Sequence, residues 1–280
     1  MKEDRKTISE VLRNNKVTFI LGKIVITFFH NYFLDPIRYL RYLLIKLKLI
    51  NNKRFQKLTS FKDLHNGERC FIVATGPSLR FEDLSLIKGE YSFSVNSIVK
   101  ILNKTTWRPT YYGIQDSNVY AKIEKDIIKC GLETIFVGHR LQNQFISAKQ
   151  FIPYFHFSCF HGKHGEFVPL TSWFSKDVSQ IVFDGYSVTY SMLQIAVYMG
   201  FKEIYLLGND CTYNLNGKQH FVESGFFDKQ AASVGERMIY AYSKAKNYAD
   251  LNGIKIYNAT RGGMLEIFER VELENIVKSK

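Results

Sequence analysis

Residues 69–78, Arg-Cys-Phe-Ile-Val-Ala-Thr-Gly-Pro-Ser, decide the fold class that we predict for this chain. The apolar, β-branched run at 70–74 ends in a Thr-Gly-Pro-Ser turn, which is typical of a buried strand that enters a tight turn. Gly76 allows the backbone to approach a phosphate closely, and Ser78 can donate its hydroxyl or cap the next helix. Gly-Pro-Ser is also an ordinary turn sequence, so the rest of the chain must decide its role.

The chain continues as apolar strands that alternate with helices. Strands are predicted at 91–96, 110–114, 134–138, 203–208 and 254–258, and helices at 121–130, 186–200 and 235–252. Largely apolar strands separated by helices indicate a mostly parallel sheet with helices on both faces. We therefore predict an α/β, Rossmann-like fold for residues 59–280, in which the aromatic, aperiodic stretch 140–183 is an excursion or lid.

In such sheets the ligand lies beyond the carboxyl ends of the strands. The residues predicted at those ends are small or polar and can approach, donate to or accept from a nucleotide. They are Thr75, Gly76, Pro77, Ser78, Asn96, Asp116 and Asp210, with Ser187 and Thr189 at the start of the 186–200 helix. Hydroxyl groups at a helix N-terminus bind anions, but they also cap helices that have no ligand. Asp210 could hold a metal or a ribose hydroxyl, or merely begin a turn.

Two common nucleotide-binding motifs are absent from the sequence. No Gly-Lys-Ser/Thr follows the 74–79 loop, which excludes a Walker A loop, and no Gly-x-Gly-x-x-Gly fingerprint occurs, which disfavours a nicotinamide enzyme. His220 lies in a polar loop after the strand that ends at Asp210. A histidine there can act as a general base toward an acceptor hydroxyl or as a cation toward a leaving phosphate, although a loop histidine is also commonly just solvated.

The net charge of +12 is concentrated near the N-terminus, where residues 1–58 carry thirteen Lys and Arg against four acidic residues. We predict a basic, amphipathic helical appendage at 1–58 whose partner is an anionic membrane surface, and no nucleic-acid partner. Residues 36–48 mix cationic and apolar positions as an interfacial helix does. The stretch 17–34 is interrupted by Lys23 and His30 and is not predicted to span a membrane. Alternatively, these apolar residues pack a helix onto the domain surface.

The four cysteines, Cys70, Cys130, Cys159 and Cys211, form no Cys-x-x-Cys pair and have no zinc-site spacing. This pattern indicates reduced thiols and a cytoplasmic protein. Together with the basic appendage, it predicts a location at the inner face of the cell membrane.

Several segments, taken in order, carry a resemblance to a known family. Residues 71–79, 95–96, 112–116, 187–210 and 256–263 look like the bacterial DUF115 group, over a span of roughly 68–270. That group is related to the archaeal-type 6-hydroxymethylpterin diphosphokinase (MptE-like) proteins and to the family 42 bacterial sialyltransferases. The sialyltransferase resemblance implies a Rossmann core with a lid, a CMP-linked sugar donor and no metal requirement.

The resemblance also implies roles for single residues. The family loop Gly-Asn-Gly-Pro-Ser-Leu corresponds to 74–79, so Thr75 stands where the donor-binding Asn would be, and Asn96 matches a family Asn. Asp116 stands where the sialyltransferases have Asn, and Tyr213 corresponds to a phosphate-binding Tyr. The hydroxyl pair at the helix start corresponds to Ser187 or Thr189.

The sequence departs from the sialyltransferases at the catalytic histidine. That family places the histidine near the start of the helix before the last core strand, and residues 233–237 contain none. Either His220 or Glu236 then supplies the base, or the reaction differs.

The sequence favours a glycosyltransferase of bacterial surface polysaccharide or lipopolysaccharide assembly. It would move a sugar from a nucleotide donor to a saccharide or lipid-linked acceptor, with no cofactor. The rival enzyme is an MptE-like diphosphokinase that would use Asp116 and Asp210 on magnesium. A third interpretation is a membrane-peripheral assembly factor without enzymatic activity.

Overall fold

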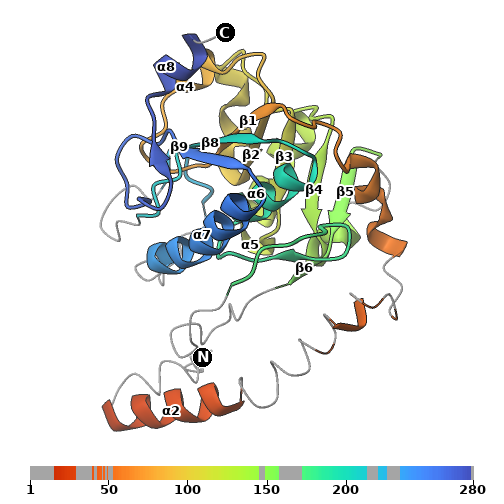
Figure 1. The fold of residues 1–280 in the computed structure, drawn as a ribbon, viewed down its shortest axis with the longest axis vertical. Coiled ribbons are helices and arrows are strands. Elements are labelled where there is room, and N and C mark those ends of the chain that lie inside the picture. The colour runs from red at the N-terminus through yellow and green to blue at the C-terminus, as the bar shows by residue number, and fades with distance from the viewer. Residues whose placement is uncertain are drawn as a thin grey trace, which may run out of the picture. The chain divides into compact units, whose positions relative to one another are not determined.

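The computed structural model describes residues 16–29, 40, 43–45, 47, 49, 53–144, 149–157, 172–212, 220–225 and 234–278. The chain divides into two compact units. One comprises Met1–Asn52 with Ser158–Thr171, and the other comprises Lys53–Phe157 with Ser172–Lys280. The second unit contains the sheet (Figure 1).

The second unit is built on an eight-stranded sheet in which every recorded pair of strands is parallel. Its order is β10-β9-β8-β1-β2-β3-β4-β5. The strands are β1 Arg69–Val73, β2 Ser92–Val95, β3 Tyr111–Ile114, β4 Ile135–Gly138, β5 Phe151–Tyr154, β8 Glu203–Leu207, β9 Lys255–Asn258 and β10 Glu269–Arg270. A separate parallel pair consists of β6 His156–Phe157 and β7 Val182–Phe183. The predicted Rossmann-like α/β fold is confirmed.

The two faces of the sheet bury different side chains of the same strand. In β1, Cys70 and Ile72 belong to one hydrophobic core, and Phe71 and Val73 belong to the other. This alternation explains why the strands are apolar without interruption, since both faces are covered. Helices α6 Val188–Tyr198 and α7 Val234–Leu251 contribute to the first core (Figure 1). The second core receives side chains of α4 Phe81–Leu86, η3 Asn96–Lys104, α5 Ser117–Lys129 and α8 Leu273–Lys278.

The strand order reverses beside β1. From β1 the chain adds β2 to β5 on one side and then returns to place β8 on the other side of β1. Parallel sheets bind ligands in the crevice outside the carboxyl ends of the strands at such a switch point. The turn after β1 and the turn after β8 therefore flank the expected crevice.

Two elements differ from the sequence prediction. Helix α5 begins at Ser117 rather than 121, because the Asp116 carboxylate accepts hydrogen bonds from the backbone N–H groups of Asn118 (2.7 Å) and Val119 (3.0 Å). Part of the 140–183 excursion joins the main sheet as β5, whose Pro153 is tolerated because β5 is an edge strand. Residues 145–148 and 158–171 of this stretch lie outside the described residues.

The segment at the predicted 58/59 boundary belongs to the second unit. The 3₁₀ helix η2 Lys53–Phe61 buries Phe55 and Leu58, and Lys57 donates to the carbonyl oxygen of Lys149 (2.6 Å). The structural division therefore falls at Asn52 instead.

In the first unit, helix α2 extends from Lys16 to Phe29. Ile20, Leu21, Ile24 and Val25 on this helix are each more than half exposed. Of the predicted interfacial stretch 36–48, only residues 40, 43–45 and 47 are described. Within the described parts of the chain, no helix combines the length and apolar character needed to cross a bilayer.

Candidate functional site

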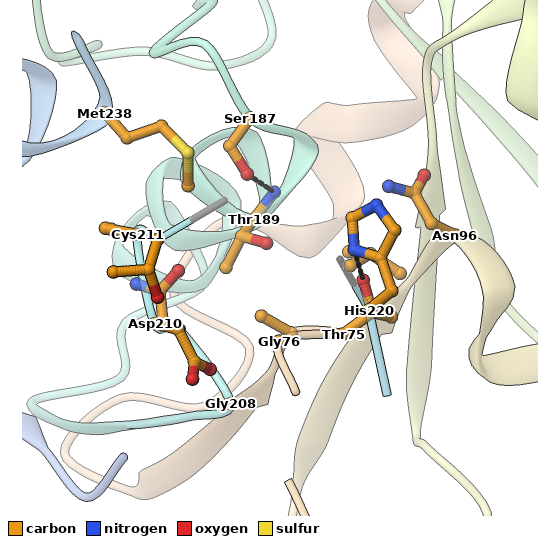
Figure 2. A pocket seen from close by; sticks show the side chains of 14 residues that line it. Thr75, Gly76, Asn96, Ser187, Thr189, Gly208, Asp210, Cys211, His220 and Met238 are labelled. Atoms are coloured by element: carbon orange, nitrogen blue, oxygen red, sulfur yellow. Dashed lines mark hydrogen bonds between the residues drawn. The ribbon is translucent and has the colours of Figure 1, made fainter. Parts of the chain in front are cut away.

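A pocket lies at the switch point between β1 and β8. Seven of the residues predicted for the site line it, which are Thr75, Gly76, Asn96, Ser187, Thr189, Asp210 and His220. Ala74, Val95, Gly208, Asn209, Cys211, Thr212 and Met238 complete the lining. In Figure 2, Thr75, His220 and Asn96 lie on one side, Asp210, Cys211 and Met238 on the other, and Thr189 between them. Segments that are far apart in the sequence therefore converge on one cavity.

Gly76 and Ser78 join the β1 turn to the β8 turn. Gly76 donates its N–H to the carbonyl oxygen of Gly208 (2.8 Å), and a Cβ at Gly76 would overlap Asp210 Oδ2 and that same carbonyl. Ser78 donates its hydroxyl to Asp210 Oδ2 (2.8 Å) and its N–H to Oδ1 (3.2 Å). Burial raises the pKa of Asp210, and the bonds from Ser78 oppose that shift. The hydroxyl predicted to face a phosphate is therefore bonded to Asp210 in this structure.

Left-handed backbone is concentrated at the pocket. Four described non-glycine residues have positive φ, and three of them, Asn96 (49°), Tyr186 (66°) and Cys211 (53°), lie in the pocket wall or directly before Ser187. Asn tolerates this conformation, but for Tyr and Cys it is strained, and such strain persists mainly at functional sites. Sequence reasoning missed Tyr186 and Cys211 because backbone strain leaves no side-chain signal.

Cys211 is not an activated nucleophile. Its side chain is buried, and burial together with the nearby charge of Asp210 raises the pKa of the thiol to about 12. The thiolate is the reactive form of cysteine. Cys211 therefore remains a neutral thiol near pH 7.

The N-terminus of α6 forms part of the pocket wall. Ser187 is its N-cap and accepts a hydrogen bond from the N–H of Thr189 (3.1 Å) through its hydroxyl oxygen. Both residues line the pocket, and Thr189 is buried. The unpaired N–H groups and positive partial charge of a helix N-terminus stabilise an anion.

Asn209 lies beside Asp210 at the end of β8 but was not among the predicted site residues. Its side chain is 2% exposed, and among the described residues Nδ2 has no hydrogen-bond partner. Its backbone N–H is held by Thr260 Oγ1 at 3.0 Å. A buried amide donor without a partner costs about 1–3 kcal/mol, and Asn209 lines the pocket, so a ligand that accepts a hydrogen bond from Nδ2 would remove this cost. Asn96 Oδ1, on the same pocket, also lacks a partner within the described parts of the chain.

His220 reaches the pocket from a loop that is held at several points. Its Nδ1 lies 3.5 Å from Thr75 Oγ1 (Figure 2). Phe221 donates its N–H to the carbonyl oxygen of Thr75 (2.7 Å), and Ser97 donates its hydroxyl to that of Val222. Lys100 donates to the carbonyl oxygens of Glu223 (3.0 Å) and Ser224 (3.1 Å). The loop therefore presents His220 from a defined position.

The electrostatics of His220 favour a neutral imidazole. Burial lowers the pKa of His220 from 6.5, and the charge of Glu223 opposes that shift. A neutral ring nitrogen can accept a proton, whereas an imidazolium cannot. The environment therefore suits a base more than a cation.

Other predicted residues lie elsewhere. Asp116 follows β3 and caps α5. Because β3 lies three strand spacings from β8, Asp116 and Asp210 are about 14 Å apart along the edge of the sheet. Glu236 is exposed and lies about 200° around α7 from the pocket residue Met238. Pro77 is not among the lining residues. Tyr213 lies outside the described residues.

The fold and sequence can be compared with those of known proteins. The chain is similar in fold to the MAf glycosyltransferase from Magnetospirillum magneticum AMB-1, with 15% sequence identity and a TM-score of 0.50. The match covers 80% of this chain and 40% of that one, so the chain spans less than half the length of the glycosyltransferase. No curated protein matches the chain.

A family model confirms the resemblance that the sequence suggested. The match extends over residues 44–216, which is more than half of the chain and includes the pocket residues from Ala74 to Thr212. His220 and Met238 lie beyond its end. The chain belongs to the 6-hydroxymethylpterin diphosphokinase MptE-like family.

Proposed function

We propose that this protein is a glycosyltransferase that moves a sugar from a nucleotide donor to a hydroxyl group of a saccharide or lipid-linked acceptor. One observation carries the proposal. The switch-point pocket combines the N-terminus of α6 with His220, whose imidazole is kept neutral by burial. An anion site and a base in one pocket are what sugar transfer from a phosphate leaving group requires.

The reaction can be written with the residues of the pocket. The phosphate of the nucleotide sugar lies at the start of α6, near Ser187 and Thr189. Asn209 Nδ2 donates a hydrogen bond to an oxygen of the nucleotide sugar. His220 takes the proton of the acceptor hydroxyl while that oxygen forms a bond to the anomeric carbon. The bond from the anomeric carbon to the phosphate oxygen breaks, and its electron pair leaves with the phosphate. The helix N-terminus stabilises the resulting charge.

The similar proteins support transfer of a sugar as the class of reaction, and they do not identify the sugar or the acceptor. The MAf protein of similar fold is a glycosyltransferase by name, although at 15% identity the likeness concerns the fold. The resemblance to the family 42 sialyltransferases favours a CMP-linked donor. Surface polysaccharide or lipopolysaccharide is the acceptor class that fits a basic N-terminal segment, because that acceptor is assembled at a membrane.

The diphosphokinase named in the family description ranks second. That reaction would need carboxylates that converge on magnesium, and ligands of one Mg²⁺ lie about 2.1 Å from the ion. Asp116 and Asp210 are too far apart to share one ion. Both oxygens of Asp210 also accept hydrogen bonds from Ser78.

Nucleotide binding tests the proposal directly. Thermal-shift measurements would compare CMP, CDP, UDP, GDP and ATP, each with and without magnesium. Stabilisation by CMP without magnesium supports the transferase. A response to ATP that needs magnesium would favour the diphosphokinase, and no response to any nucleotide would favour a non-enzymatic assembly factor.

The pH profile of transfer should report His220. A base acts when it is deprotonated, so kcat/KM should be constant above about pH 6.5 and fall only at lower pH. Glu223→Gln removes the charge that raises the pKa of His220, so the acid limb should move to still lower pH. Glu236→Gln, at an exposed position away from the pocket, should leave the profile unchanged. An acid limb that moves upward in Glu223→Gln would contradict this assignment.

We also propose that α2 binds an anionic membrane surface, with the protein at the inner face of the cell membrane. The helix has 14 residues and is about 21 Å long, which is shorter than the hydrocarbon core. Its apolar side chains Ile20, Leu21, Ile24 and Val25 are exposed in a strongly basic segment, as in helices that lie in the interface.

Vesicle flotation tests this surface. Ile24→Asp should remove most of the binding of the full chain to phosphatidylglycerol vesicles, because a carboxylate would enter the acyl boundary. Leu251→Asp is the matched control, since Leu251 is 86% exposed but lies in α7 of the other unit. Equal flotation of Ile24→Asp and the unsubstituted protein would refute binding through α2.

A further inference from the structure

A buried pair of side chains outside the pocket is connected to the pocket wall. His156 Nε2 donates to Asp184 Oδ2 at 2.9 Å, and each side chain is 7% exposed. The other carboxylate oxygen, Oδ1, accepts the N–H of Tyr186 (2.9 Å). Neither residue lines the pocket, and no prediction from the sequence involved Asp184.

The turn from Asp184 to Ser187 has little freedom of its own. Tyr186 has a φ of 66°, a conformation that a tyrosine rarely adopts. A Cβ at Gly185 would overlap the ring of Tyr190, so only glycine fits there. The Asp184 carboxylate is the acceptor that holds the Tyr186 N–H, and one residue later Ser187 becomes the N-cap of α6. The geometry of this turn therefore determines where Ser187 and the first N–H groups of α6 lie.

The pair anchors the turn to a second piece of structure. His156 belongs to β6 and Asp184 follows β7, and these strands pair only with each other among the described strands. On the other side, the guanidinium of Arg237 lies 5.8 Å from the ring centroid of Tyr186. The turn is thus held between the small sheet and α7, which contributes Met238 to the pocket.

We propose that His156 and Asp184 are positioning residues that hold Ser187 and the first turn of α6 in the geometry that receives the phosphate of the nucleotide. The identity of that ligand rests on the proposed function, but the positioning of the turn does not. Replacing both partners of a buried hydrogen bond by apolar groups of the same shape often costs little stability, so stability alone does not account for this pair. The hydrogen bond from the Tyr186 N–H to Asp184, in the strained turn beside the pocket, gives the pair a role in positioning that turn.

The test compares Asp184→Ala with Glu90→Ala. Glu90 is the matched control because it is a mostly buried carboxylate, paired with Arg69 (2.9 Å) at the opposite end of β1 from the pocket. We expect Asp184→Ala to weaken CMP binding about tenfold in calorimetry. It should also speed hydrogen exchange at the amides of Tyr186, Thr189 and Tyr190. Glu90→Ala should lower Tm while leaving both quantities unchanged.

A conservative variant separates hydrogen-bond geometry from charge. In Asp184→Asn the side chain can still accept from Tyr186, and it can donate to His156 once the imidazole changes tautomer. CMP affinity and exchange should therefore return to within about twofold of the original protein. If Asp184→Ala does not fold, His156→Ala carries the same measurements, with the same increase in exchange and loss of affinity expected.

The outcomes are distinguishable from failure of the proposed function. If the unsubstituted protein binds no nucleotide, the proposed function fails, and exchange at residues 186–190 alone decides the role of the pair. Unchanged exchange in Asp184→Ala, or equal effects of Asp184→Ala and Glu90→Ala on CMP affinity, would overturn the positioning role.

Discussion

Replacing His220 by alanine is expected to lower kcat for transfer by about 10²- to 10⁴-fold, the range that a general base contributes. CMP affinity should stay nearly unchanged, because the phosphate contacts that we propose come from the α6 N-terminus and not from the imidazole. The physical basis is the pocket position of His220 and the burial that lowers its pKa. CMP release from a CMP-linked donor, measured beside calorimetric CMP binding, separates the two quantities.

The control for this variant is another histidine of the same unit. His65 is bonded to Glu68 (2.6 Å) and Tyr111 (2.7 Å) and does not line the pocket. His65→Gln should therefore affect stability more than kcat. Full activity in His220→Ala would show that the acceptor proton goes elsewhere, and it would leave the pocket as a binding site without an assigned base.

Replacing Gly76 by alanine is expected to abolish nucleotide binding and to lower the free energy of unfolding by about 3 kcal/mol, the upper part of the usual cost of overpacking. The added methyl group would overlap Asp210 Oδ2 and the carbonyl oxygen of Gly208. One of these neighbours is backbone, so the β1 and β8 turns must separate. Urea denaturation and CMP thermal shift measure the two effects.

Gly131→Ala is the control for the loss of glycine itself. Gly131 has a φ of 61°, and a Cβ there would have no neighbour within 4 Å. This variant should cost about 1 kcal/mol, which is the penalty for left-handed backbone alone, and should leave CMP binding intact. If Gly76→Ala were no more destabilising than Gly131→Ala, the β1 and β8 turns would be less closely locked than the Ser78–Asp210 bonds indicate.

The pocket owes its form to two turns that are bonded to each other. Ser78 and Gly76 hold the β8 turn from one side, and Thr260 holds the N–H of Asn209 from the other. The Asn209 backbone is thereby fixed while Nδ2 remains without a partner among the described residues. These hydrogen bonds join the two turns without the help of a ligand, and such preorganisation lowers the entropic cost of binding.

Local sequence was sufficient to predict most of the sheet. The strands at β1, β2, β3, β4, β8 and β9 were predicted because a strand buried on both faces must be apolar at nearly every position. The local sequence also predicted polar residues at the carboxyl ends of these strands, because the direction of a parallel strand determines which end faces the crevice. Strand β5 was missed because it contains a proline, which argues against a strand inside a sheet.

Tertiary structure decided which of those polar residues face the pocket. Ser78 and Asp116 were both predicted to belong to the nucleotide site, but Ser78 is bonded to Asp210, and Asp116 caps α5 three strands away from β8. Asn209 and the His156–Asp184 pair lie next to or near predicted residues, and nothing in the local sequence distinguished them. The sequence by itself determined the strands and their polar ends, since those depend on neighbours along the chain. Strand order and the partner of each polar atom depend on residues that are distant along the chain, such as Ser78 and Asp210, which are 132 positions apart, and only the folded chain brings these together.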